Sequence, residues 1–260
     1  MKLFYETRGA GEPLILIPGF ASGAWTWFCQ IEDLAKDFRV ITFDPRGIGK
    51  SEAAENDLEN LSMQSFVRDV AQILDELKIE KAHVLGASFG GFVAQALALE
   101  FPERVDKLIL ACTTAGGKDH VKPDIEILRS FAPDASLPVG EKIRKFIRPA
   151  FTEVFNRERA DEVEKVCQMR EQNIVADATY MAQLHTAFTF DLSAEIGAIE
   201  NETLVITGDQ DSVVPMENSL NLAKEIPDAR LEIIANGSHL FFIENADEFN
   251  RAVSEFLHCF

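Results

Sequence analysis

The sequence predicts an α/β protein with a mostly parallel, twisted sheet that is flanked by helices. Three observations lead to this fold class. Short apolar runs recur along the chain, helical patterns fill most of the gaps between them, and one long stretch of helices interrupts the alternation. Alternation of strands and helices is typical of parallel sheets whose crossovers are right-handed.

The apolar runs are the predicted strands. They are continuous rather than alternating, which indicates strands that are covered on both faces of a parallel sheet. The runs occupy residues 14–18, 39–43, 82–87, 107–112, 202–208 and 230–235, and one further run, residues 3–7, precedes them.

Helical patterns follow several of these runs. Residues 65–77 place their apolar side chains on one stripe, as an amphipathic helix does. Residues 89–100 begin directly after a strand, and residues 244–257 form a last amphipathic helix.

The alternation stops between residues 116 and 199, where the sequence shows only helical patterns, punctuated by prolines. We therefore predict a core formed by residues 1–115 and 200–260, into which residues 116–199 are inserted as a helical cap between two strands. The helices expected in the cap lie at about 124–131, 139–155, 158–172 and 176–188.

Composition limits the classes of partner. The chain has 260 residues, and 25 Lys plus Arg against 43 Asp plus Glu give a formal net charge of -18. Such a field repels nucleic-acid phosphates and anionic membrane surfaces, so neither is an expected partner. The four cysteines are scattered, without metal-ligand spacing, which suits a reducing compartment. No apolar stretch typical of a signal peptide opens the chain. We expect a cytoplasmic protein, monomer or homodimer, that acts on a small molecule without cofactor or metal.

The segment 44–51 ends in Gly49-Lys50-Ser51, as a phosphate-binding loop does. Such a loop requires a first glycine at position 44, where this chain has Asp44, and an acidic side chain there would repel phosphate. Gly47 and Gly49 are better explained by a tight turn after a strand. We expect Arg46 to bind backbone carbonyls and hold this loop.

The segment Gly86-Ala87-Ser88-Phe89-Gly90 matches G-x-S-x-G. It follows a predicted strand and opens a predicted helix, which is the context that a nucleophile elbow requires. Small neighbours leave room for a strained turn that exposes the Ser88 hydroxyl at the carboxyl edge of the sheet. Ser88 is therefore the candidate nucleophile.

A serine hydroxyl needs a base, and the base needs an orienting carboxylate. On this kind of sheet the order along the chain is serine, acid, histidine. Asp209 and Asp211 follow the predicted strand 202–208, and His239 follows the strand 230–235. Because both loops lie at the same edge as Ser88, His239 is the candidate base and either aspartate is a candidate acid.

Taken together, these segments resemble the α/β-hydrolase family, in particular its small cap-bearing serine hydrolases of the esterase and enol-lactonase kind. The resemblance covers nearly the whole chain. It is carried by the motifs PGF (18–20), DPRGIGKS (44–51), GASFGG (86–91), GDQDSVVP (208–215) and GSHLFFIE (237–244).

The resemblance implies a sheet of about seven strands and a catalytic triad of Ser88, Asp211 and His239. It also implies an oxyanion hole made by the backbone N–H groups of Phe20 and Phe89. Three departures stand out. Pro18 replaces a histidine that often braces the oxyanion loop, Ser238 stands between the usual Gly-His pair, and only one strand precedes residues 14–18. The first antiparallel strand of the family is therefore expected to be missing or vestigial.

Aromatic residues flank the catalytic ones. We expect Trp25, Trp27, Phe188 and Phe241 to line an apolar acyl pocket beneath the cap. The cap also carries cations, one of which could meet an anionic substrate: Arg129, Arg144, Lys145, Arg148 and Arg170.

The leading hypothesis is hydrolysis of a carboxylic ester or lactone of a small apolar substrate through an acyl-enzyme on Ser88. Two alternatives use the same residues. One is hydrolysis of a carbon–carbon bond in a diketone, and the other is a catalytically slow homologue that senses a small ligand.

Overall fold

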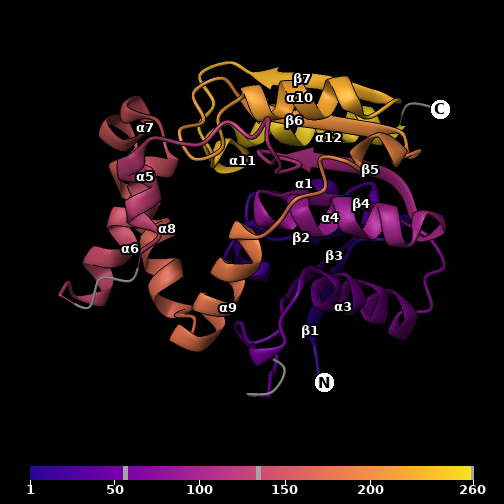
Figure 1. Cartoon of the computed structure of the whole chain (residues 1–260), viewed down its shortest axis with the longest axis horizontal. Coiled ribbons are helices and arrows are strands. Elements are labelled where there is room, and N and C mark those ends of the chain that lie inside the picture. The colour runs from indigo at the N-terminus through magenta and orange to yellow at the C-terminus, as the bar shows by residue number, and fades with distance from the viewer. Residues whose placement is uncertain (55–57, 133–135, 259–260) are drawn as a thin grey trace.

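In the computed structural model, which describes residues 1–54, 58–132 and 136–258, one seven-stranded sheet runs through the molecule in the order β1-β3-β2-β4-β5-β6-β7 (Figure 1). β1 is antiparallel to β3, and the other pairs are parallel, which confirms the predicted fold class. The strands are β1 (Phe4–Arg8), β2 (Glu12–Ile17), β3 (Phe38–Asp44), β4 (Ala82–Ala87), β5 (Val105–Ala111), β6 (Thr203–Gly208) and β7 (Ala229–Ile234).

The chain before β2 forms the single strand β1, which pairs with β3 at one edge of the sheet. In the described part of the chain no other strand precedes β2, as the short N-terminal run predicted.

Both faces of the sheet are covered, which explains the continuous apolar runs. Alternate side chains of β2 point to opposite faces: Ile15 and Ile17 join the apolar cluster of α3 and α4, whereas Leu14 and Leu16 join that of α1 and α12. The helices around the sheet are α1 (Ile31–Leu34), α3 (Met63–Glu76), α4 (Phe89–Glu100), α10 (Glu217–Glu225), α11 (Phe241–Glu244) and α12 (Ala246–His258), with short 3-10 segments η1 (Ala24–Trp27), η2 (Pro102–Arg104) and η4 (Ile196–Ala198). Among the described residues, no helix combines the length and apolar character that crossing a bilayer requires.

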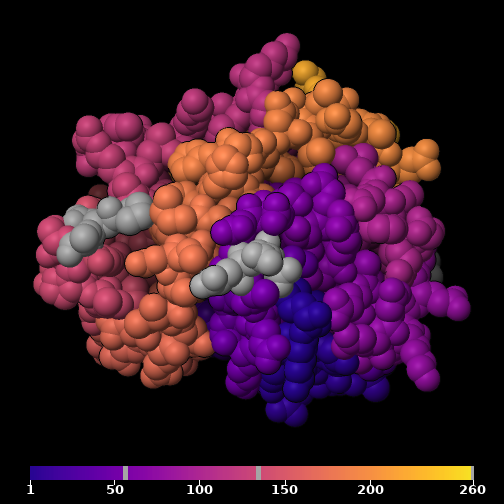
Figure 2. All heavy atoms as spheres, turned by 60° about the horizontal axis from the view of Figure 1, so that its bottom comes forward, coloured from indigo at the N-terminus to yellow at the C-terminus, as the bar shows by residue number. Residues whose placement is uncertain are grey.

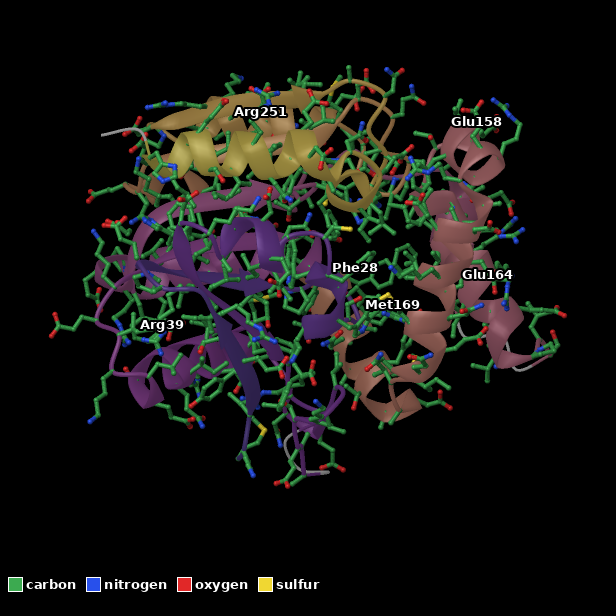
Figure 3. The ribbon with its side chains drawn as sticks, turned by 180° about the vertical axis from the view of Figure 1, so that it is seen from behind. Phe28, Arg39, Glu158, Glu164, Met169 and Arg251 are labelled. Atoms are coloured by element: carbon green, nitrogen blue, oxygen red, sulfur yellow. The ribbon has the colours of Figure 1, made fainter. Side chains whose placement is uncertain are left out.

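The stretch between β5 and β6, which we call the helical insert (residues 116–199), gathers at one side of the sheet (Figure 1). From behind, Glu158, Glu164 and Met169 lie on its helices, whereas Arg39 and Arg251 lie on the part that holds the sheet (Figure 3). Besides η4 near its end, its helices are α5 (Ile125–Ser130), α6 (Val139–Ile147), η3 (Arg148–Ala150), α7 (Glu153–Glu158), α8 (Ala160–Gln172) and α9 (Asp177–Phe188).

One expected helix of the insert, 139–155, is interrupted. α6 ends at Ile147, η3 follows, and α7 begins at Glu153. Pro149 has no N–H to continue the helical hydrogen bonds. The new helix is capped by Thr152, whose hydroxyl accepts the N–H of Phe155 at 3.1 Å. The expectation of one continuous helix was therefore wrong.

The loop after β3 is a structural turn organised by Asp44. One carboxylate oxygen accepts the N–H of Ala24 and the other that of Lys50, both at 2.9 Å. Arg46 donates to the Ser65 carbonyl at 2.9 Å, but its main partner is the carboxylate of Asp69, at 2.6 and 2.7 Å. The expectation that Arg46 binds backbone carbonyls thus describes only one of its contacts.

The same loop adjoins the insert. A side-chain carbon at Gly47 would lie 2.7 Å from the hydroxyl of Thr179 in α9. In the space-filling view, orange atoms of the insert border the purple atoms of this part of the chain (Figure 2). The insert therefore contacts core loops at this edge of the sheet.

Candidate active site

Ser88 occupies a strained turn between β4 and α4, with φ +54° and ψ -118°. L-residues other than glycine rarely adopt a positive φ, and strain of this kind gathers at functional sites. The turn is held by the N–H of Ser88, which donates to the Ala111 carbonyl at 2.9 Å, and by the Thr113 hydroxyl, which donates to the Ser88 carbonyl at 2.8 Å.

The glycines of the motif permit close backbone approach. A side-chain carbon at Gly90 would collide with the carbonyl oxygen of Ile17 and lie 2.7 Å from that of Pro18. A carbon at Gly91 would lie 2.5 Å from the Thr113 side chain. The start of α4 is therefore pressed against the end of β2, next to the loop that begins at Pro18.

Gly90→Ala is expected to lower the free energy of unfolding by about 3 kcal/mol, because rigid backbone must shift to admit the methyl group. Helix propensity alone would predict a gain of about 1 kcal/mol. The matched control is Gly197→Ala, since the nearest atom to its new carbon would be the Glu225 carbonyl oxygen at 3.4 Å. Urea unfolding curves measure both, and equal midpoints for the two variants would contradict the packing argument.

Asp211 and His239 form a buried acid–base pair. Asp211 follows β6, His239 follows β7, and the imidazole Nδ1 lies 2.8 Å from the Asp211 Oδ2. The other carboxylate oxygen accepts the N–H groups of Val213 and Val214, each at 2.8 Å. A carboxylate can only accept, so in the neutral imidazole the proton lies on Nδ1 and Nε2 keeps a lone pair for use as a base. Asp211 rather than the exposed Asp209 meets the histidine.

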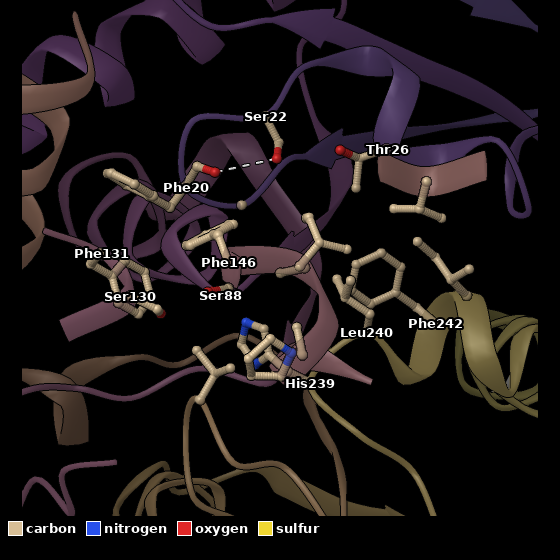
Figure 4. Close-up of a pocket in the computed structure, with 18 of the residues that line it drawn as sticks. Phe20, Ser22, Thr26, Ser88, Ser130, Phe131, Phe146, His239, Leu240 and Phe242 are labelled. Carbon is tan, nitrogen blue, oxygen red and sulfur yellow. Dashed lines mark hydrogen bonds between the residues drawn. The ribbon is translucent and has the colours of Figure 1, made fainter. Parts of the chain in front are cut away.

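Ser88 and His239 line one cavity of about 70 Å³ (Figure 4). In the figure, Ser130 and Phe131 of the insert stand on one side of these two residues, and Leu240 and Phe242 on the other. Within the described chain no hydrogen bond joins the Ser88 hydroxyl to the imidazole. In enzymes without substrate such bonds are often long and tighten on binding.

The two expected oxyanion donors lie near Ser88. Phe89 is the first residue of α4, so its N–H has no acceptor in a preceding helical turn. Gly19, which precedes Phe20, is so close that a side-chain carbon on it would lie 3.5 Å from the Ser88 Cβ. The Phe20 ring packs edge-on against Tyr180 of the insert, with centroids 4.8 Å apart. Their role as donors stays a prediction.

Of the four expected pocket residues, one lines the cavity and three do not. Trp25 lines the cavity. The expectations for Trp27, Phe241 and Phe188 were wrong. Trp27 is fully buried in the core, with its ring 5.2 Å from that of Phe242, and Phe241 is fully buried as well. Phe188, at the end of α9, is 66% exposed. In the short helices η1 and α11, residues one or two apart point in different directions, so Trp25 and Phe242 face the cavity while their neighbours face the core.

Sequence reasoning missed the residues that the insert contributes to the site. Ser130, Phe131 and Phe146 line the cavity. Gln183 reaches the loop after Pro18, and so does Arg170, which the sequence indicated only as a possible contact of an anionic substrate. The sequence offered only a weak signal, because polar and aromatic residues on amphipathic helices usually lie at the surface or in the core.

Cys112 lies beside the acid–base pair, and its sulfur and donor atoms of Asp211 and His239 lie within 4.8 Å of one another. Such a cluster could in principle hold a metal ion. Burial raises the pKa of the Cys112 thiol well above its usual range, and the nearby Asp211 carboxylate raises it further. Because Asp211 and His239 already pair with each other at 2.8 Å, we interpret the group as an acid–base pair with a thiol next to it.

Comparisons with known proteins identify the fold family. The family model described as the alpha/beta hydrolase fold matches residues 12–188 and 177–246. A putative carbamate hydrolase RutD from Azorhizobium caulinodans is 31% identical over 98% of this chain and 94% of its own length. A 2-hydroxy-6-oxo-6-phenylhexa-2,4-dienoate hydrolase from Comamonas testosteroni is 31% identical over 98% of this chain and 91% of its own. The structure of an enol-lactonase from Burkholderia xenovorans superposes with a TM-score of 0.84, at 25% identity, over 98% and 96% of the two chains.

Proposed function

Because the chain belongs to the alpha/beta hydrolase fold family, we propose that this hydrolase cleaves a carboxylic ester or lactone of a small apolar substrate through an acyl-enzyme on Ser88. The observation that carries the proposal is that His239, which is paired with the buried Asp211, lines one apolar cavity together with Ser88.

The proposed chemistry follows from the atoms at the site. The Ser88 oxygen attacks the substrate carbonyl carbon while Nε2 of His239 takes the hydroxyl proton. The N–H groups of Phe20 and Phe89 stabilise the negative charge that develops on the carbonyl oxygen. The imidazolium then gives its proton to the leaving alcohol. Water then attacks the acyl carbon while the same histidine takes its proton. The bond from the acyl carbon to the Ser88 oxygen breaks, and the histidine returns the proton to that oxygen.

The cavity supports an uncharged acyl group. None of the described residues that line it is an aspartate, glutamate, lysine or arginine. A dienoate carries a carboxylate, which would lose its hydration here without a cation to replace it. The small volume of the cavity, about 70 Å³, also favours a short acyl chain.

The second candidate is hydrolysis of a carbon–carbon bond in a dienoate. The similarity to the Comamonas dienoate hydrolase favours it. So does a neighbouring cavity of about 390 Å³, which shares Ser130 and Phe146 with the first. Its charged lining residues are three cations and one carboxylate: Lys142, Lys145, Arg170 and Asp177.

A substrate panel separates these candidates. Purified protein is offered p-nitrophenyl acetate and butyrate, a γ-lactone and a δ-lactone, an N-carbamate and a 2-hydroxy-6-oxo-dienoate, and kcat/KM is measured for each. We expect the esters or lactones to have the highest values. Cleavage of the dienoate with no turnover of any ester or lactone would overturn the proposal in favour of the second candidate.

A further inference from the structure

The peptide group between Phe20 and Ala21 contacts the insert directly at its N–H. Its carbonyl contacts the insert through Ser22, and the Arg170 guanidinium also approaches this carbonyl at 3.5 Å. Its N–H, on Ala21, donates to the Gln183 Oε1 of α9 at 2.8 Å. Its carbonyl, on Phe20, accepts the Ser22 hydroxyl at 3.2 Å (Figure 4). That hydroxyl in turn accepts from the Arg170 guanidinium of α8 at 3.0 Å. These partners are separated by 148 and 162 positions in the sequence.

The bond from the Ala21 N–H to Gln183 is buried, and the bond from Arg170 to Ser22 is partly buried. Ala21 is fully buried, Gln183 is 1% exposed and Arg170 is 7% exposed. Charge-assisted and buried hydrogen bonds are stronger and more directional than those at the surface. The clamp formed by Arg170 and Gln183 is therefore a rigid link between the insert and the loop after β2.

Arg170 differs from Arg144 and Arg129, two other arginines of the insert. Arg144 pairs with Glu164 and Glu171, and Arg129 pairs with Glu126 near the surface. In the described chain Arg170 has no acidic partner, and burial lowers its pKa to about 10. A buried cation without a counter-ion is costly, so fold stability alone does not explain it.

The clamped peptide is next to the one that carries the expected oxyanion donor. Fixing the plane of Phe20–Ala21 sets ψ of Phe20 and φ of Ala21, which is +48°. A positive φ is unfavourable for alanine and persists only where the surroundings impose it. Pro18 has no side-chain group that could brace the loop from within. The insert thus constrains the peptide group that directly follows the Phe20 N–H.

We propose that Arg170 and Gln183 are positioning residues that hold the Phe20 N–H in the oxyanion hole, so that the helical insert, and not only the core, sets the geometry of catalysis. This inference rests on the proposed Ser88-dependent hydrolysis. The clamp touches neither the nucleophile nor the base, so its removal alters the stabilisation of the tetrahedral intermediate and not the binding of the ester.

The test uses two variants that keep the length of the side chain but lose its polar end, Gln183→Met and Arg170→Met. With p-nitrophenyl acetate, we expect kcat to fall by about 10- to 100-fold with little change in KM, because a misplaced donor acts mainly in the transition state. An alkylboronic acid, whose tetrahedral adduct with Ser88 places an oxygen in the same hole, should bind more weakly by a similar factor.

Conservative variants and a matched control complete the test. Gln183→Glu keeps the acceptor and Arg170→Lys keeps a donor, so both should recover most of the lost kcat. Gln172→Met makes the same change at an exposed position at the end of α8 and should behave as wild type. Replacing a buried unpaired charge by an apolar side chain is not expected to destabilise the fold, so Arg170→Met decides the question if Gln183→Met does not fold.

Two results would overturn the inference. One is wild-type kcat and boronate affinity in both methionine variants while Ser88→Ala is inactive, which refutes the clamp and leaves the proposed function standing. The other is a rise in KM with unchanged boronate affinity, which indicates a role in substrate binding alone. Undiminished activity of Ser88→Ala would instead refute the proposed function.

Discussion

Ser88→Ala is expected to lower kcat for p-nitrophenyl ester hydrolysis by about 10⁶-fold, the scale seen when a triad enzyme loses its nucleophile. The methyl group cannot attack the carbonyl, and His239 and Asp211 then have no oxygen to activate. The fold should be unaffected, because the strained turn is held by backbone contacts of Ser88 and not by its hydroxyl. Steady-state rates at saturating ester measure the effect, with thermal unfolding as a check on the fold.

A second serine of the same cavity provides the control. The Ser130 hydroxyl donates to the Ile127 carbonyl at 2.6 Å and is not joined to the acid–base pair. Ser130→Ala should keep kcat within a few-fold of wild type. A fluorophosphonate should label the wild type and Ser130→Ala but not Ser88→Ala. Equal rates for Ser88→Ala and wild type would remove the basis for an acyl-enzyme.

Asp211→Asn is expected to lower kcat by about 10⁴-fold while leaving the fold intact. The carboxylate holds the proton of His239 on Nδ1, so that Nε2 can accept the proton of Ser88. An amide can present its NH₂ group to Nδ1 instead, which stabilises the tautomer with the proton on Nε2, and that tautomer cannot act as the base.

The neighbouring carboxylate provides a matched comparison for this change. Asp209 lies two residues earlier in the same loop and is exposed, so Asp209→Asn should retain wild-type kcat. Rates of both variants are measured from pH 6 to 9. If Asp209→Asn lost as much activity as Asp211→Asn, the pairing of Asp211 with His239 would not be the orienting interaction.

The sheet and its carboxyl edge could be predicted because the necessary signals are local. Each buried strand is a continuous apolar run, and the turn at Ser88 needs small residues at fixed positions beside it. The choice of Asp211 over Asp209 needed the family resemblance, because both aspartates follow the same strand. The structure supplies the physical reason, since only Asp211 has its carboxylate turned inward to meet His239.

The walls of the cavity could not be predicted in the same way. Which of Trp25 and Trp27, or of Phe241 and Phe242, faces the cavity depends on the direction of one turn of a short helix. The contact of Gln183 with Ala21 joins segments 162 positions apart, and no local pattern reports such a pairing. The break in the expected helix 139–155, by contrast, could have been predicted from the sequence, because Pro149 lies within it and prolines usually end helices.

The hydrogen bonds from Gln183 and Arg170 to the loop after β2 limit how the insert can be exchanged in protein engineering. Exchanging residues 116–199 for the helices of another hydrolase is an obvious route to new substrate preferences. In this chain such a chimaera would change the residues that line the cavity. It would also lose the hydrogen bonds that Gln183 and Arg170 make to the loop at Phe20. A graft that retains glutamine at 183 and arginine at 170 should therefore yield active hybrids more often than one that replaces the segment wholesale.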